Sequence, residues 1–234
     1  MRACDRSSDA VAGLLVKILI VSDVHGNLDA LDALTESCDE LWVLGDLVNY
    51  GPEPAAVIQR LRQRASVIVR GNHDHAVGYD VDPRCSPAFR AMAETTRQLA
   101  MATLSEADKR FLRDLPLSVS TERDGRRFFL CHATPSDPLF AYCPPDSPTW
   151  ADESAAVDAD VILVGHTHLP FIKRFETRTV VNPGSLGHRR TADLMPRTPS
   201  GRTGNSCYAK CGTRSSGPLR RSRRSRCRRI SSVR

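Results

Sequence analysis

The chain has 234 residues, enough for one domain with a buried core, and it contains no apolar run of the roughly eighteen residues that a membrane helix needs. Its net charge of +6 is unevenly distributed: residues 188–234 hold 14 of the 33 lysines and arginines with Asp193 as their only acid, which leaves 19 basic and 26 acidic residues before them. The basic charge therefore belongs to the C-terminal segment, and the acidic body argues against nucleic acid as a specific partner.

The eight cysteines are scattered and form no C-x-x-C pair, which predicts reduced thiols rather than disulfides or a thiolate metal site. The N-terminal apolar run from Leu14 to Val21 is short and interrupted by Lys17, so it is more typical of a strand than of a signal peptide. We therefore expect a cytoplasmic protein with no membrane partner.

The first half of the chain alternates between strand and helix patterns. Short apolar runs predict strands at Lys17–Ser22, Leu41–Leu44 and Ser66–Val69, and helical spacing over Asn27–Cys38 and Pro54–Arg64 predicts the helices between them. This order of elements indicates an α/β layer.

The second half begins with helix and continues with strands. Residues 88–114 predict two helices, the second of them capped by Ser105. The dipeptide Asp124-Gly125 favours a tight hairpin turn. The expected strands are Leu117–Thr121, Arg127–Cys131, Val161–Val164, Phe171–Phe175 and Thr179–Val181, the last two forming a second hairpin.

Side chains that can bind metal follow five of these expected strands. Each block alone is more often a turn or a hydrogen-bonded core histidine, but loops at the carboxyl ends of adjacent strands converge, so all five together predict one site. In chain order the blocks are Asp23-Val24-His25, Gly45-Asp46, Gly71-Asn72-His73-Asp74, His132 and Gly165-His166-Thr167-His168.

The order of these blocks resembles that of the calcineurin-like metallophosphoesterases, and the resemblance extends from about Lys17 to Leu186. The segment Asn182–Ser185 also resembles a motif of the small bacterial phosphodiesterase-like members. The resemblance implies a four-layer α/β/β/α sandwich with two mixed β-sheets and a dinuclear metal site at their edge.

Carried over to this chain, the resemblance implies two divalent metal ions, with manganese expected and iron, zinc or nickel as alternatives. A metal-bridging hydroxide would attack a small phosphodiester or phosphomonoester, and His73 would assist the leaving group without binding metal. One ion would be held by Asp23, His25, Asp46 and His168, and the other by Asp46, Asn72, His132 and His166, with Asp46 bridging.

Some positions depart from the related protein Ser/Thr phosphatases or leave alternatives open. Those phosphatases have an Asp-Arg pair where this chain has Asn49 and Tyr50, which argues against a protein substrate because tyrosine cannot grip phosphate as arginine does. Cys131 is interpreted as a small buried residue rather than a thiol nucleophile. The segment Pro135–Pro148 either covers the site or is a surface connector.

Three alternatives to an active enzyme remain. The first is a non-catalytic scaffold of the retromer type, which would need neither His73 nor the complete ligand set. Both are present in this chain, which argues against the scaffold. An RNA-binding module should interleave aromatic and basic residues, whereas Tyr208 is the only aromatic residue of the C-terminal segment. The third alternative is an inactive product of a frameshift.

The two ends of the chain are expected to lie outside the functional fold. We interpret residues 1–16 as a non-native extension, 17–187 as the metallophosphoesterase domain and 188–234 as a disordered basic tail that arose by frameshift. A family-like chain would continue from Gly187 with a segment such as Gly-Gln-Pro-Ala-Asp. If one base is removed from the codon of that glutamine, the reading frame shifts and can encode the residues observed from Gly187 to Thr198. The fold would then lack its last strands and have an open sheet edge.

Overall fold

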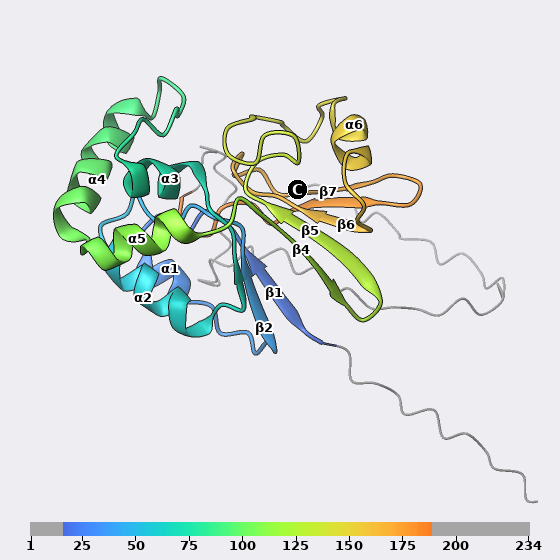
Figure 1. The fold of residues 1–234 in the computed structure, drawn as a ribbon, viewed down its shortest axis with the longest axis horizontal. Helices are drawn as coiled ribbons and strands as arrows, with labels where there is room; N and C mark the ends of the chain where they lie inside the picture. Colours follow the sequence, from blue (N-terminus) through green and yellow to red (C-terminus); the bar gives the residue numbers. More distant parts are fainter. Residues whose placement is uncertain (1–15, 189–234) are drawn as a thin grey trace, which may run out of the picture.

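The structure is a computed structural model that describes residues 16–188, so apart from Val16 and His188 the expected extension and basic tail lie outside the described residues. Figure 1 shows two sheets side by side, with most of the helices on the outer side of the first. The strands are β1 (Ile18–Val21), β2 (Glu40–Val43), β3 (Val67–Ile68), β4 (Ser118–Arg123), β5 (Arg126–Cys131), β6 (Val161–Leu163), β7 (Phe171–Arg174) and β8 (Thr179–Asn182). The helices are α1 (Leu28–Asp32), α2 (Pro54–Arg64), α3 (Asn72–Tyr79), α4 (Arg90–Thr103), α5 (Glu106–Asp114) and α6 (Trp150–Ala155).

The two sheets differ in strand direction. The first has the order β1-β2-β3, and both of its strand pairs are parallel. The second has the order β4-β5-β6-β8-β7, in which β5, β6 and β8 are parallel and the edge strands β4 and β7 are antiparallel to their neighbours. Over the described residues only the second sheet is mixed, because α1 and α2 carry the chain back between strands of the first sheet and so make them parallel.

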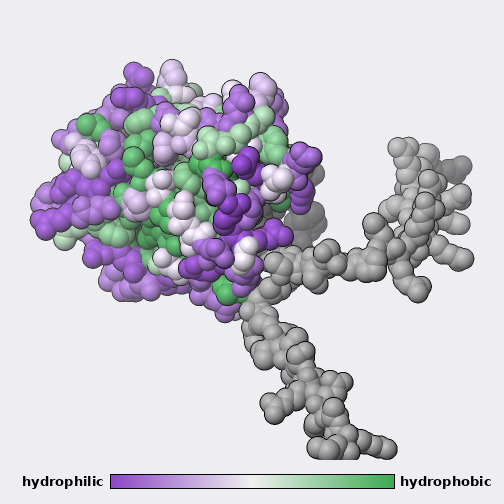
Figure 2. Space-filling view, turned by 45° about the vertical axis from the view of Figure 1, so that its right-hand side comes forward, coloured by the Kyte–Doolittle hydropathy of each residue, from purple (hydrophilic) through white to green (hydrophobic). Residues whose placement is uncertain are grey.

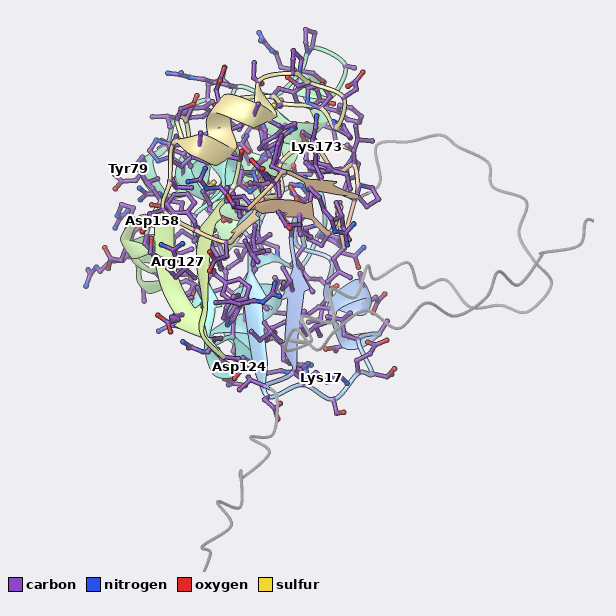
Figure 3. The ribbon with its side chains drawn as sticks, turned by 90° about the vertical axis from the view of Figure 1, so that its right-hand side faces the viewer. Lys17, Tyr79, Asp124, Arg127, Asp158 and Lys173 are labelled. Carbon is purple, nitrogen blue, oxygen red and sulfur yellow. The ribbon has the colours of Figure 1, made fainter. Side chains whose placement is uncertain are left out.

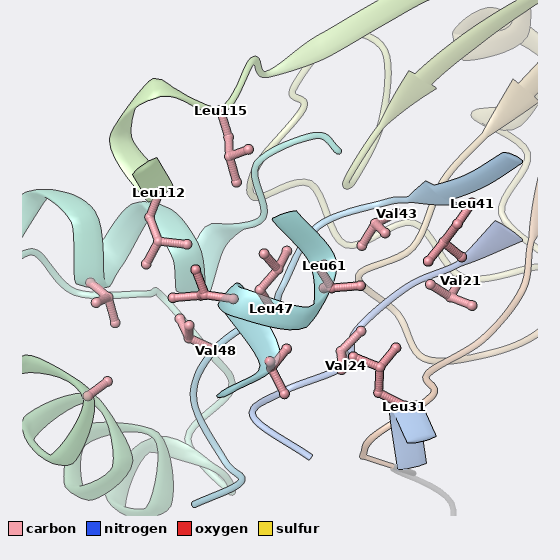
Figure 4. Close-up of a cluster of buried hydrophobic side chains, with 14 of the residues drawn as sticks. Val21, Val24, Leu31, Leu41, Val43, Leu47, Val48, Leu61, Leu112 and Leu115 are labelled. Carbon is pink, nitrogen blue, oxygen red and sulfur yellow. The ribbon is translucent and has the colours of Figure 1, made fainter. Parts of the chain in front are cut away.

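Three apolar clusters separate four layers. The side chains of Trp42, Leu130 and Leu163 lie between the two sheets, where the Trp42 ring meets that of Phe128 edge to face at 5.1 Å. A second cluster joins the first sheet to its helices (Figure 4), and a third packs Trp150 of α6 against the far face of the second sheet. The predicted α/β/β/α order is therefore confirmed.

Local differences from the expected elements concern short helices. The helix expected over Asn27–Cys38 is shorter: Asn27 caps it by accepting a hydrogen bond from the amide of Ala30 at 2.9 Å, and α1 ends at Asp32, before the weak helix formers Thr35 and Ser37. Helices α3 and α6 were not expected. The hairpin at Asp124-Gly125 is confirmed, since both residues have the positive φ angles, 51° and 71°, that a tight turn of this kind needs.

The surface is mixed in character. Figure 2 shows hydrophilic side chains over much of one face, with smaller hydrophobic patches between them. Arg127 pairs with Asp158 and Asp160 on the outside of β5 (Figure 3), where water screens both ion pairs. No helix in the described part of the chain is both long and apolar enough to cross a membrane.

Candidate metal centre

The loops that follow β1, β2, β3, β5 and β6 bring the seven expected ligand side chains to one place at the edge of the sheets. Within this cluster Nε2 of His168 lies 3.1 Å from Oδ1 of Asp23, and Nε2 of His132 lies 3.3 Å from Oδ2 of Asp46. Two overlapping groups are compact enough to hold a metal ion, namely Asp23 with His25 and His168, and Asp23 with Asp46 and His132. All seven residues are buried: Asp23, His25, Asp46, Asn72, His132, His166 and His168.

Asn72 supplies an amide oxygen to the side of the cluster that contains His132 and His166. Its Oδ1 lies 3.1 Å from Nε2 of His132 and 3.1 Å from Nδ1 of His166. Its Nδ2 donates to the carbonyl of Pro83 at 2.7 Å, which turns the amide so that the oxygen faces the cluster. Asn72 can therefore act as a neutral oxygen ligand.

Five residues of the cluster have a left-handed backbone, which side chains other than glycine rarely adopt. Such strain costs of order 1–3 kcal/mol per residue and persists only where neighbouring contacts enforce it. Here the amide of Asp23 donates to the carbonyl of Gly45 at 3.0 Å, and the amide of His25 donates to the carbonyl of Asp46 at 2.9 Å. The φ angles are 55° at Asp23, 51° at His25, 55° at Asp46, 63° at His166 and 63° at His168.

Main-chain carbonyls fix three of the imidazole rings. A carbonyl can only accept a hydrogen bond, so the Nδ1 atom facing it carries the proton, and in the neutral ring Nε2 is left with a lone pair directed into the cluster. The three pairs are His25 with the carbonyl of Val48, His132 with that of Leu44 and His168 with that of His188.

This arrangement fits a cation. Nε2 of His25 and Nε2 of His168 lie 3.1 Å apart, and in the neutral rings both atoms present lone pairs. Oδ1 of Asp23 is buried, has no hydrogen-bond partner among the described residues, and lies 3.7 Å from Nε2 of His25 and 3.1 Å from Nε2 of His168. Facing lone pairs and a buried carboxylate oxygen repel one another, and a divalent cation bound by all three atoms removes that repulsion.

The pKa values in the cluster follow from burial and from the facing charges. Burial lowers the pKa of His25 well below its ordinary value, which keeps this ring neutral and able to ligate. For His132 burial acts in the same direction, but the carboxylates of Asp46 and Asp23 and the carbonyl of Leu44 together outweigh it and raise the pKa to about 9.

His73 lies beside the two groups without belonging to either. Its amide donates to Oδ1 of Asp46 at 2.9 Å, and its Nδ1 lies 2.8 Å from Nδ2 of Asn49. Burial is the main cause that lowers the pKa of His73 to about 4, so its ring is neutral near pH 7. The ring is 5.3 Å from that of His25, centroid to centroid, next to the ligands.

Asp74 has a structural role that sequence reasoning missed. Its Oδ1 accepts hydrogen bonds from the amides of Leu47 at 2.8 Å and Val48 at 3.3 Å, and its Oδ2 accepts one from the amide of Gly71 at 3.0 Å. One buried carboxylate thus ties the loop after β2 to the start of α3. Its place as the fourth residue of the Gly-Asn-His-Asp block was the available signal.

Two open questions about neighbouring residues are answered by the geometry. Cys131 is fully buried, and burial raises the pKa of its thiol, so it is a packing residue rather than a nucleophile. The segment Pro135–Pro148 reaches the cluster, since the ring of Tyr142 is 6.2 Å from that of His166, centroid to centroid. This segment therefore borders the site as well as connecting β5 to α6.

Comparison with known proteins agrees with this geometry. The family model described as the calcineurin-like phosphoesterase superfamily domain matches residues 16–196. The phosphodiesterase YfcE of Escherichia coli strain K12 is 27% identical over 190 residues, covering 74% of this chain and 80% of that protein. An uncharacterized protein of Methanocaldococcus jannaschii is 27% identical over 194 residues, which is 74% of this chain and 77% of the relative.

A solved structure shows the same fold. The crystal structure of a metallophosphoesterase from Sphaerobacter thermophilus superimposes with a TM-score of 0.64 at 29% identity, covering 77% of this chain and 80% of that one. The family match, the phosphodiesterase relative and the buried cluster of metal-binding side chains together show a phosphoric ester hydrolase with candidate metal ligands. The chain belongs to the calcineurin-like phosphoesterase superfamily.

Proposed function

We propose that the protein hydrolyses a small phosphodiester or phosphomonoester with two divalent metal ions held at this cluster. Asp23, His25, Asp46 and His168 would hold one ion, and Asp46, Asn72, His132 and His166 the other. The observation that carries the proposal is the pair of facing Nε2 atoms of His25 and His168, 3.1 Å apart beside the unpartnered Oδ1 of Asp23. When bound, two such ions activate a water molecule and offset the negative charge of the phosphoryl oxygens.

In this proposal His73 assists the leaving oxygen of the ester, by protonating it or by stabilising its charge. The side-chain amide of Asn49 donates to Nδ1 of His73, so the neutral ring carries its proton on Nε2, the atom available to a substrate. The hydrogen bond from the amide of His73 to Asp46 fixes the ring beside the ligands. The neutral ring can therefore donate a hydrogen bond from Nε2 that stabilises the negative charge on the leaving oxygen, without an aspartate to stabilise a charged ring.

The ligand types determine which metals are suitable. Carboxylate, amide and imidazole donors without thiolate suit manganese, iron, zinc and nickel. We propose Mn²⁺ as the principal cofactor, a cytoplasmic location and a small molecule as substrate. The segment that contains Tyr142 and borders the site is the part of the chain best placed to select among substrates.

Metal analysis combined with a hydrolysis screen tests the proposal. Purified protein freed of metal is reloaded with Mn²⁺, Ni²⁺, Mg²⁺ or Zn²⁺ and assayed with bis-p-nitrophenyl phosphate, p-nitrophenyl phosphate and nucleotides. We expect about two bound ions per chain, no activity without metal and the highest activity with Mn²⁺. Full activity in the presence of a strong chelator, or no metal binding under any condition, would contradict the proposal.

A further inference from the structure

We propose that residues 185–188 form a clasp that holds the loop of Asp23 and His25 against His168, and so sets the affinity of one of the two metal positions. The inference rests on the proposed two-metal site. It adds residues that are not themselves ligands, and it predicts that the two positions respond differently when these residues change. The clasp consists of Ser185, Leu186, Gly187 and His188.

The clasp is hydrogen-bonded along the loop that follows β1. Two of the bonds run from clasp amides to loop carbonyls, one from a clasp hydroxyl, and one from a loop side chain back to the clasp. The amide of Leu186 donates to the carbonyl of Ser22 at 2.9 Å, and the amide of Gly187 donates to the carbonyl of Asp23 at 3.0 Å. Oγ of Ser185 donates to the same Asp23 carbonyl at 2.9 Å, and Nδ2 of Asn27 donates to the carbonyl of Gly187 at 3.1 Å.

The other end of the clasp contacts a ligand from the second sheet. Nδ1 of His168 donates to the carbonyl of His188, which leaves Nε2 of His168 free to face Asp23. The amide of His188 donates to Oγ of Ser185 at 2.8 Å, so this hydroxyl connects the two ends by accepting from His188 while donating to Asp23. Partners of this kind typically change metal affinity by about 10- to 100-fold when they are lost.

The position of Gly187 shows how tightly the clasp lies on the loop. A Cβ atom at this residue would be 1.8 Å from the carbonyl oxygen of Val24 and 2.6 Å from its carbonyl carbon. Main-chain atoms cannot yield as a flexible side chain does, so any larger residue must lift the clasp away from the loop. The approach of two backbones therefore requires glycine here.

The hydrogen bonds of the clasp fall on one side of the cluster, and the ring of His188 in addition stacks on that of Tyr50, with 4.6 Å between the centroids. The hydrogen bonds reach Asp23 and His168 and the loop that contains His25, whereas His132 is held by the carbonyl of Leu44 and Asn72 by that of Pro83. Loss of the clasp should therefore weaken the ion held by Asp23, His25 and His168 and leave the other ion in place. A general loosening of the fold would affect both ions.

Gly187→Ala in the full chain is the direct test. Metal-free protein is titrated with Mn²⁺ by calorimetry, and bound metal is counted by elemental analysis after gel filtration. We expect two ions on the unaltered protein, and on the variant one ion of unchanged affinity and one weakened at least about tenfold. Gly125→Ala is the control for backbone strain, because Gly125 has a positive φ angle, which Gly187 does not, and a Cβ at Gly125 would meet no described atom within 4 Å.

Two further variants separate the clasp from misfolding. Ser185→Ala removes one hydroxyl without introducing a clash, and it should weaken the same ion by about tenfold while circular dichroism stays unchanged. Ser120→Ala removes an exposed hydroxyl from β4, which contributes no residue to the cluster, and should leave both ions at their original affinities. The clasp proposal is overturned if both Gly187→Ala and Ser185→Ala bind two ions with unchanged affinity. It is also overturned if the variants weaken both ions equally.

The test also distinguishes failure of the clasp from failure of the two-metal proposal. If the unaltered protein binds a single ion, the two-metal proposal is wrong. The clasp is then supported if Ser185→Ala weakens that ion, and refuted if it does not.

Discussion

Asn49 and His73 form a buried pair in which Nδ2 of Asn49 lies 2.8 Å from Nδ1 of His73. An amide that donates to Nδ1 selects the ring form with a proton on Nε2, and burial lowers the pKa of this ring to about 4. An aspartate at position 49 would instead favour a charged ring. The pair therefore holds a neutral ring with a proton on Nε2 beside Asp46, and the first two predictions follow from it.

Replacing His73 with alanine removes the proposed acid without removing a proposed ligand. We expect kcat to fall by about 10²- to 10⁴-fold on an ester with a poor leaving group, with bound metal unchanged. The reduction should be smaller with a nitrophenyl ester, because that leaving group needs little protonation. His75→Ala, two residues further along α3, is the control and should keep its activity. Full activity of His73→Ala on the poor leaving group would exclude the acid role.

Replacing Asn49 with alanine leaves His73 in place but removes the amide that selects its protonated nitrogen. We expect a reduction in kcat of at least about tenfold on the poor leaving group and little change in KM or metal content. Asn49→Asp should restore a partner for Nδ1 but raise the pKa of His73, and this pKa can be followed by NMR of the metal-free protein. An unchanged kcat in Asn49→Ala would show that the ring needs no partner.

Asp46→Asn tests the proposed bridging role of the Asp46 carboxylate. Since one side chain would serve both ions, we expect the variant to lose both under conditions in which the original protein holds two, and activity to fall to background. Elemental analysis after gel filtration measures the bound metal. Asp158→Asn is the control, because its side chain is 82% exposed and remote from the cluster. Retention of one tightly bound ion would show that Asp46 does not bridge.

Asp74→Asn should affect stability more than chemistry. The amide cannot accept at both of its terminal atoms, so at least one of the amides of Leu47, Val48 and Gly71 loses its partner. We expect the free energy of unfolding in urea to fall by about 1–3 kcal/mol. Asp80→Asn is the control, since asparagine tolerates the positive φ angle at this exposed end of α3. Equal stability of the two variants would contradict the structural role of Asp74.

The nucleotide sequence of the gene tests the proposed frameshift. Restoring one base after the codon for Gly187 should open a frame that encodes alternating apolar strands before a normal stop. In the described part of the chain β1 is paired with β2 alone, so its other edge can receive a strand. We expect the restored protein to unfold at a higher temperature than the present chain. A stop codon directly after the restored base would refute the proposal.

The sequence alone determined the order of the main elements and the positions of the ligand blocks. Apolar runs such as Val161–Leu163 are buried on both sides, and a residue that follows such a strand must lie at the sheet edge whatever the rest of the fold does. This constraint is local, so the strand-end positions of Asp23, Asp46 and His166 could be read without coordinates.

Only the tertiary structure decided which atoms face one another. The carbonyl of His188 holds His168, and Asp74 binds the loop after β2, through contacts that join residues distant in the chain. Main-chain carbonyls are present at every residue, so no side-chain pattern marks the ones that orient an imidazole. The strained angles at Asp23 and His25 likewise depend on the neighbouring loop after β2. Residue types fixed the chemistry available to the site, whereas packing between strands fixed its geometry.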